Sequence, residues 1–200
     1  LWGMEARVQK HSAWAKLGKV NTDLPWRSFG SQYKASYYSQ DSKFGRRNYN
    51  NIQRNYYANF IYQSIIGNTN HVIKMGASGR WDVREERLND LVLDRTEKSA
   101  GVYSEYAYSP TENFDLVAGL RMDYHNLFDL FITPRLHLRY APAELTVFRL
   151  SGGRAQRTAD IISDNMGLLA SNRQFLIDGD MGSDLPYGMP ATIAWNAGFG

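Results

Sequence analysis

Residues 113–124 read NFDLVAGLRMDY, and their side chains alternate in character with a period of two. The apolar set is Phe114, Leu116, Ala118, Leu120 and Met122, and the set between them is Asp115, Val117, Gly119, Arg121 and Asp123. Successive side chains of a strand point to opposite faces of a sheet, so this stretch predicts a strand with one apolar and one polar face. The strict alternation favours a strand over a helix, whose apolar residues recur three and four positions apart.

The same alternation recurs along the chain and predicts about nine strands. It is clear in the stretch FITPRLHLRY at 131–140, where Pro134 is expected to mark a bulge or a local break. Residues 1–9 are interpreted as holding the end of an earlier strand, and no segment has a convincing helical pattern. The predicted strands cover about 11–20, 27–40, 54–66, 70–80, 98–109, 113–124, 130–140, 144–156 and 190–200.

The connections between these strands alternate in length. Short turns are expected at 21–26, 67–69, 110–112 and 141–143, and mostly longer loops at 41–53, 81–97, 125–129 and 157–189. In an up-and-down antiparallel sheet every second connection lies on the same side, so one rim carries the short turns and the other the longer loops. This asymmetry is typical of outer-membrane barrels.

Alternation alone does not distinguish a soluble sandwich from a membrane barrel, but three features favour the barrel. The predicted strands run about 10–13 residues, and about 9–11 tilted residues cross a bilayer. Charge runs along the whole polar face, and the apolar face carries Tyr106, Tyr108, Phe114 and Tyr140 near the short turns. We therefore predict an all-β, antiparallel up-and-down transmembrane β-barrel, with residues 1–200 forming part of one barrel domain. In the expected register, Asp115 and Arg139 form an ion pair on the polar face.

Composition excludes several other classes. The 200 residues include no Cys, which removes disulfide scaffolds, thiol catalysis and Cys-based zinc sites. A net charge of +3 is weak support for nucleic-acid binding, so no nucleic-acid partner is expected. The mean hydropathy of −0.48 reflects an apolar strand face diluted by polar positions and loops, and it does not argue for solubility.

No catalytic or metal-binding constellation stands out. The four His residues, at positions 11, 71, 125 and 137, lack the spacing of metal ligands. Ser151 precedes two glycines but has no nucleophile-elbow context and no partner base. The sequence therefore predicts a protein that is not an enzyme, with no catalytic residues, no metal site and no cofactor.

The candidate ligand-binding residues lie in the predicted longer loops or, for Tyr124, directly before one. Binding residues often occupy loops held by a rigid scaffold, and these loops are rich in aromatic and polar side chains. The candidates are Arg46, Tyr49, Trp81, Tyr124, Asn126, Arg157, Asp160, Asn165, Arg173 and Tyr187.

Four stretches resemble the barrels of TonB-dependent outer-membrane receptors. RLSGGRAQRTADIISDN at 149–165 is similar to a family strand that ends in Ser-x-Gly and runs through Arg-Thr into a long loop. PATIAWNAGF at 190–199 resembles the next strand, although Ala191 replaces the acid of the family's Pro-Glu. FDLVAGLR at 114–121 and TPRLHLRYAP at 133–142 look like the preceding hairpin. The variant after Gly153 looks like receptors of the Bacteroidetes group.

The resemblance implies a fragment of a barrel of about 22 strands whose plug domain is not present in this chain. It implies a receptor in the bacterial outer membrane that binds a scarce solute (an iron–siderophore chelate, haem or cobalamin) and imports it with TonB-derived energy. The expected partners are the TonB complex acting through the missing plug, the small-molecule or metal-chelate ligand, the lipid bilayer and a surface lipoprotein. The alternatives are a passive porin-like channel and a soluble β-rich binding module.

Overall fold

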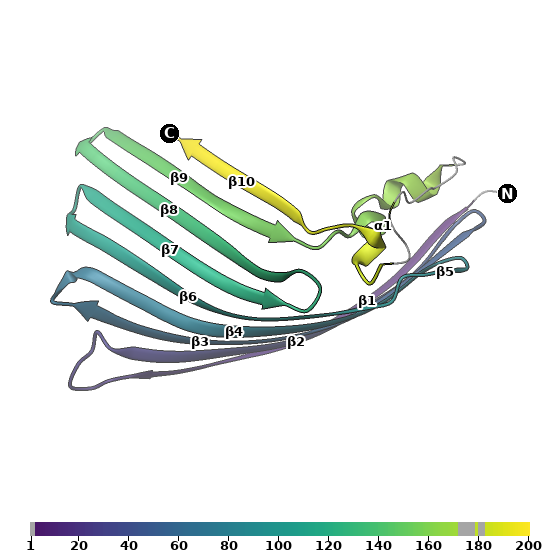
Figure 1. Ribbon diagram of the computed structural model, residues 1–200, viewed down its shortest axis with the longest axis horizontal. Helices are drawn as coiled ribbons and strands as arrows, with labels where there is room; N and C mark the ends of the chain where they lie inside the picture. Colours follow the sequence, from purple (N-terminus) through teal and green to yellow (C-terminus); the bar gives the residue numbers. More distant parts are fainter. Residues whose placement is uncertain (1–2, 172–178, 180–182) are drawn as a thin grey trace.

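The computed structural model describes residues 3–171, 179 and 183–200, and these form an all-β fold. The strands make one antiparallel sheet in which each strand pairs with its neighbour along the chain, while the two-residue strand β5 pairs with β4 beside this path. Figure 1 shows the sheet curving like a section of barrel wall. The predicted up-and-down all-β fold is confirmed. The strands are β1 (Met4–Val20), β2 (Ser28–Phe44), β3 (Arg47–Ile66), β4 (Asn68–Leu88), β5 (Leu91–Val92), β6 (Arg95–Thr111), β7 (Phe114–His125), β8 (Asp129–Ala143), β9 (Thr146–Arg157) and β10 (Thr192–Phe199).

Two of the predicted long loops are largely strand. β2 and β3 are joined by a two-residue turn at 45–46, where Gly45 has a φ of 61°, so the expected loop 41–53 is a continuous hairpin. The expected loop 81–97 likewise contains the end of β4, all of β5 and the start of β6. Alternation is hard to see in both segments because both faces of the sheet carry polar residues there.

Smaller boundary predictions were also wrong. Residues 4–10 belong to β1 and are not the end of an earlier strand. The turn expected at 141–143 lies at 144–145, because β8 continues to Ala143. Pro134 pairs in register with Leu120, but the ladder from β8 to β9 ends at Arg135, so a local break lies beside the proline as expected.

The two ends of the sheet differ, and we name them the short-turn end and the extended end. The turns at 21–27, 67, 112–113 and 144–145 lie together at the short-turn end, on the left of Figure 1. At the extended end, β3 and β4 reach 20 and 21 residues, whereas about 9–11 suffice to cross a bilayer. The two rims therefore differ as predicted, but the extended end owes its length to long strands and to one long connection, residues 158–191.

That loop contains the only helical turns among the described residues. They are α1 (Ile161–Asp164) and two short 3₁₀ segments, η1 (Met166–Ala170) and η2 (Pro186–Gly188). Tyr187 adopts a φ of 55° inside η2, followed by Gly188 at 66°. No helix in the described ranges is long and apolar enough to cross a membrane.

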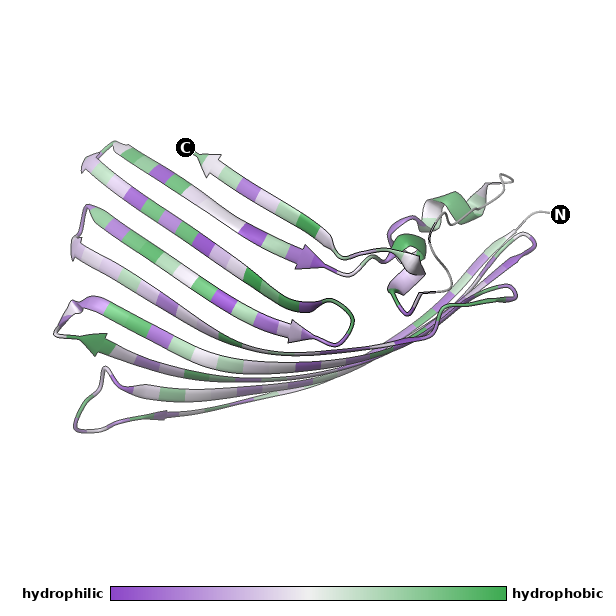
Figure 2. Cartoon of the chain, viewed as in Figure 1, coloured by the Kyte–Doolittle hydropathy of each residue, from purple (hydrophilic) through white to green (hydrophobic). Residues whose placement is uncertain are grey.

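The register separates an apolar outer face from a polar inner face, and Figure 2 shows the alternation along β7 to β9. On the inner face Asp115 pairs with Arg139 at 3.1 Å, which confirms the predicted ion pair. On the outer face Phe114 lies between Tyr108 and Tyr140, with ring centroids 6.3 and 6.5 Å away. These contacts form the expected aromatic belt at the short-turn end.

Candidate functional site

The described residues of loop 158–191 fold back over the inner face at the extended end and build a small core there. Figure 1 shows α1 lying over the ends of the long strands. Ile162 is 0% exposed and Leu169 is 1% exposed, because both pack against apolar side chains of the sheet. The core consists of Phe44, Tyr49 and Leu88 from the sheet and Ile162, Leu169 and Tyr187 from the loop.

A buried carboxylate anchors this core to the sheet. Glu86 on β4 is 2% exposed and accepts hydrogen bonds from Tyr49 Oη at 2.6 Å and from Tyr187 Oη. Burial, reinforced by the Glu86 carboxylate, raises the pKa of both tyrosines above their ordinary value. Both phenols therefore stay protonated and keep donating. Glu86 thus joins a sheet residue and a loop residue through one buried acceptor.

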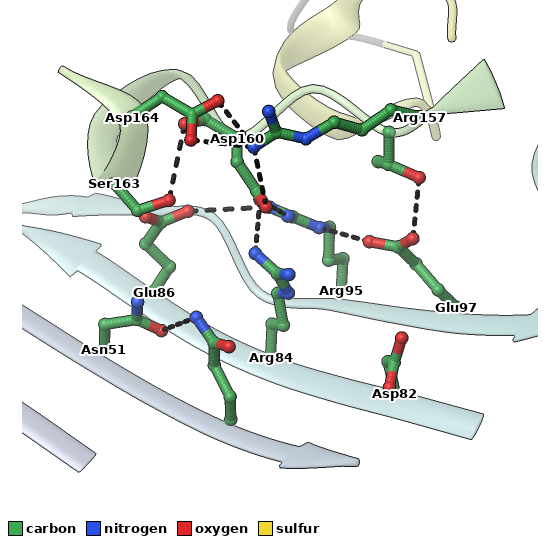
Figure 3. A network of polar contacts seen from close by, with 12 residues as sticks. Asn51, Asp82, Arg84, Glu86, Arg95, Glu97, Arg157, Asp160, Ser163 and Asp164 are labelled. Atoms are coloured by element: carbon green, nitrogen blue, oxygen red, sulfur yellow. Dashed lines mark hydrogen bonds and ion pairs between the residues drawn. The ribbon is translucent and has the colours of Figure 1, made fainter. Parts of the chain in front are cut away.

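A second carboxylate, Asp160, links the start of the loop to two strands. Figure 3 shows Asp160 between Arg84 of β4 and Arg95 of β6, and it forms an ion pair with each. Burial alone lowers the pKa of Arg95, but its hydrogen bonds to Glu97 and Tyr187 and the charge of Asp160 outweigh burial and raise the pKa. The guanidinium therefore remains charged in a nearly buried position.

Glu97 ties the same cluster to β7. Its carboxylate accepts a hydrogen bond from Arg95 Nε at 2.8 Å and one from Thr158 Oγ1 at 2.7 Å, and it lies 3.6 Å from His125 Nε2. Burial would raise the pKa of Glu97, but hydrogen bonds from His125, Thr158 and Arg95 lower it to about 2. A cavity of about 240 Å³ with charges of both signs lies beside these groups.

A larger cavity of about 760 Å³ opens on the inner face between β1 and the loop. Its wall is rich in amides, hydroxyls and phenols, and the described residues that line it include no acidic side chain. Arg80 pairs with Asp82, whereas Lys10 and Lys34 are exposed and form no ion pair with a described residue. The wall therefore presents two available ammonium groups among neutral donors and acceptors.

The structure brings together some of the sequence candidates. Tyr49, Asp160 and Tyr187 meet in the buried network, where they hold the loop in place. Arg157 lies at the end of β9 and donates two hydrogen bonds of 2.7 Å to Asp164. Asn165 caps the same turn, where its Nδ2 donates to Ile161 O at 2.8 Å. These positions organise the loop and its approach to the inner face.

Other candidates lie apart from this cluster. Arg46 occupies the hairpin tip between β2 and β3, and Asn126 uses its side chain to close the turn after β7, accepting from Lys98 N at 2.6 Å. Trp81 and Tyr124 lie on the outer face of the sheet and are 49% and 59% exposed. Both cavities lie on the inner face, so these two side chains point away from them. Arg173 lies outside the described residues.

The sequence analysis missed the residues that line the larger cavity, above all Lys10 and Lys34. Lys10 lies between the stretch 1–9 and the predicted strand 11–20, and Lys34 lies inside the predicted strand 27–40, so neither is among the loop candidates. Strand alternation could have indicated Lys34, because alternate residues share a face of the sheet. The pairing of β2 with β3 and of β3 with β4 places Lys34 on the same face as Arg80. In the described ranges, no group of three or more His, Asp or Glu side chains is placed to hold a metal ion.

The comparison with protein families decides what kind of barrel this is. The family model described as TonB dependent receptor-like, beta-barrel, matches residues 5–191, which is most of the chain. The chain belongs to the TonB-dependent receptor β-barrel family. The predicted resemblance to these receptors is confirmed, and the Bacteroidetes-like character stays a prediction.

Two solved receptor structures share the fold. The alcaligin outer-membrane receptor FauA from Bordetella pertussis matches with a TM-score of 0.63 at 13% identity, over 79% of this chain and 31% of that one. The siderophore receptor PirA from Pseudomonas aeruginosa matches with a TM-score of 0.59 at 16% identity, over 78% of this chain and 30% of that one. The chain therefore spans less than a third of either receptor. A search of curated proteins found no match.

Proposed function

We propose that this chain forms part of the wall and outer vestibule of an outer-membrane receptor that imports an anionic iron–siderophore chelate with TonB-derived energy. The observation that carries the proposal is the inner-face cavity in which Lys10 and Lys34 stand among amides and phenols without an acidic neighbour in the described lining. A ferric chelate with deprotonated oxygen donors is bulky, oxygen-rich and anionic. Such a cavity suits it in charge and in hydrogen-bonding capacity.

The family and the fold neighbours support this proposal. TonB-dependent receptor barrels are outer-membrane proteins, and both similar structures are described as receptors, one for alcaligin and one for siderophores. The two edges of the described sheet are β1 and β10, and a barrel removes such edges by closure. We therefore place residues 1–200 in one larger barrel, with a plug, the TonB complex and a surface lipoprotein as partners.

Haem is a weaker candidate for this part of the receptor. His125, the last residue of β7, is 9% exposed. Its Nε2 faces Glu97, and its Nδ1 accepts a hydrogen bond from Leu127 N at 3.2 Å. Both ring nitrogens are thus engaged within the protein.

The test is ligand binding by the full-length receptor, measured by quenching of its tryptophan fluorescence. The probes are a ferric catecholate, a ferric hydroxamate, haemin and cyanocobalamin. Replacing Lys34 with Gln removes one unpaired charge from the cavity and should weaken ferric-chelate binding roughly three- to ten-fold, or ~0.7–1.4 kcal/mol. Lys43→Gln, an exposed lysine outside the cavity, is the matched control and should bind as the parent does.

Two results would overturn parts of this proposal. Binding of haemin or cyanocobalamin in place of every ferric chelate would reject the siderophore assignment. Uptake that continues in cells without TonB would reject energised transport and favour the porin-like channel.

A further inference from the structure

The outer face carries an apolar groove of about 860 Å³ that runs across the strands from β1 towards β6. Its floor is formed by small residues, including Ala58 and Gly79, which pair directly across β3 and β4. The next outer-face pair along the same two strands is Tyr56 and Trp81, whose ring centroids lie 5.7 Å apart at the side of the groove. The floor offers no side-chain donor or acceptor, so the groove is suited to a hydrocarbon chain.

The row of Tyr56 and Trp81 lies at the boundary between the apolar and the charged parts of the outer face. Two residues further along β3 towards the extended end, Arg54 donates to Glu85 Oε1 at 2.5 Å. Along the strand, the aromatic pair is followed by an ion pair. This order is expected where a barrel wall passes from the hydrocarbon core into the headgroup region. The groove therefore lies just inside the outer surface of the bilayer.

One cation stands in that aromatic row. Lys98 pairs with Trp81 across β4 and β6, and its Nζ lies 5.7 Å from the centroid of the Trp81 ring. The side chain is exposed and makes no ion pair with any residue in the described ranges. The other outer-face cation near a tryptophan, Arg154, donates instead to Ile132 O at 2.7 Å. Lys98 is thus an available positive charge at headgroup depth.

We propose that this groove binds a phosphorylated lipid of the outer leaflet, with an acyl chain over Ala58 and Gly79 and a phosphate on Lys98. A lysine near a membrane surface attracts an anionic headgroup, and an acyl chain needs no polar partner in the floor. An extended protein segment fits less well, because its backbone laid along this floor would leave polar groups unpaired. The inference depends on the outer-membrane location and is independent of the transported ligand.

The experiment measures lipid retained by the full-length receptor, purified in detergent, by native mass spectrometry. The probes are bisphosphorylated lipid A and the same lipid A without its phosphates. Lys98→Gln should lower the affinity for the phosphorylated probe about five-fold and leave the dephosphorylated probe unchanged. Lys98→Arg keeps the charge and should bind as the parent does.

A second variant tests the groove itself. A Cβ at Gly79 meets its nearest heavy atom, Ser99 O, at 3.9 Å, so Gly79→Leu fits the strand and fills the groove. It should lower binding of both probes. Lys43→Gln controls for general loss of positive charge, and heat-modifiable migration on gels confirms that each variant forms a folded barrel.

The outcomes separate the possible occupants. Equal affinity of the parent and Lys98→Gln for the phosphorylated probe would overturn the proposal. So would an equal loss with Lys43→Gln, which would indicate unspecific charge attraction. A dimer of the receptor that disappears in Gly79→Leu, with no lipid bound to the parent, would assign the groove to a second copy of the chain and would also overturn it.

Discussion

The short-turn end and the extended end are built from the same strands but are stabilised in different ways. At the short-turn end, aromatic rings touch along the outer face and the inner-face ion pair of Asp115 and Arg139 stays well exposed. At the extended end, the loop covers the inner face and buries Glu86 to 2% exposure. One end resembles the wall of a membrane barrel, whereas the other has the packed interior of a small soluble domain.

This difference shows that the contribution of an inner-face charge to stability depends on its position along the strand. Where that face is wet, an ion pair is screened by water and contributes little. Where the loop covers it, the same kind of residue must be fully hydrogen-bonded, and removing one partner leaves another buried and unsatisfied. Substitutions at the two ends should therefore differ in cost even when the chemistry removed is similar.

The largest effect is expected for Glu86→Ala at the extended end. This change leaves Tyr49, Tyr187 and Arg95 without their shared acceptor and should destabilise docking of the loop by about 3–5 kcal/mol. Limited proteolysis should then cut the loop 158–191 quickly, while heat-modifiable migration reports an intact barrel. A loop that resists protease as well as in the parent would contradict the role given to Glu86.

The next effect is expected where the wall meets lipid. Leu120 lies on the outer face, so Leu120→Arg should destabilise the barrel by about 2–4 kcal/mol if the residue lies near the bilayer midplane. Urea unfolding in phospholipid vesicles measures this cost. The matched control is Val117→Arg, which places the same side chain on the inner face and avoids the lipid. Equal stability of Leu120→Arg and the parent would show that the faces are assigned the wrong way round.

A smaller effect should follow from acid at the extended end. Because the folded pKa of Glu97 is about 2 and its ordinary value is 4.5, its contribution is complete above pH 4.5 and is lost as pH falls towards 2. Lowering pH from 4.5 to 3.5 should cost the folded barrel up to about 1.4 kcal/mol. Loop docking should lose part of this, through the hydrogen bond from Thr158 to Glu97. The titratable groups that face it are Arg95, His125 and Asp82.

Hydrogen exchange of the loop amides between pH 3 and 6, corrected for the intrinsic exchange rate, measures this dependence. The Glu97→Gln variant serves as the control, since it has no carboxylate to titrate at this position. An identical pH dependence in the parent and in this variant would assign the effect to another group.

Alternation predicted the fold wherever the two faces differ in polarity. It correctly gave the register of β7 and β8, including the pair of Asp115 and Arg139, because one face there meets lipid and the other meets water. It failed at 41–53 and 81–97, where both faces leave the bilayer and charge appears on each side. No period of two remains there to identify a strand, although the backbone stays paired.

The site was less predictable because its residues are defined by pairing across strands and by the fold of one loop. Tyr49 and Tyr187 were chosen as exposed ligand contacts, yet both are buried against Glu86, which the sequence analysis did not consider. Trp81 was chosen from a predicted loop that is a strand, and strand parity turns it to the outer face. Ligand contact by any of the ten candidates stays a prediction.

The smallest effect is expected for Asp115→Asn at the short-turn end. Asp115 and Arg139 are 42% and 38% exposed, so water screens their attraction and the loss should be no more than about 1 kcal/mol. Arg139 also donates to Glu112 O at 3.1 Å, which keeps a partner for the guanidinium when the carboxylate is gone. Urea unfolding in vesicles, with and without added salt, measures the change. A loss as large as that of Glu86→Ala would mean that something also covers the inner face at this end, and the contrast between the two ends would no longer hold.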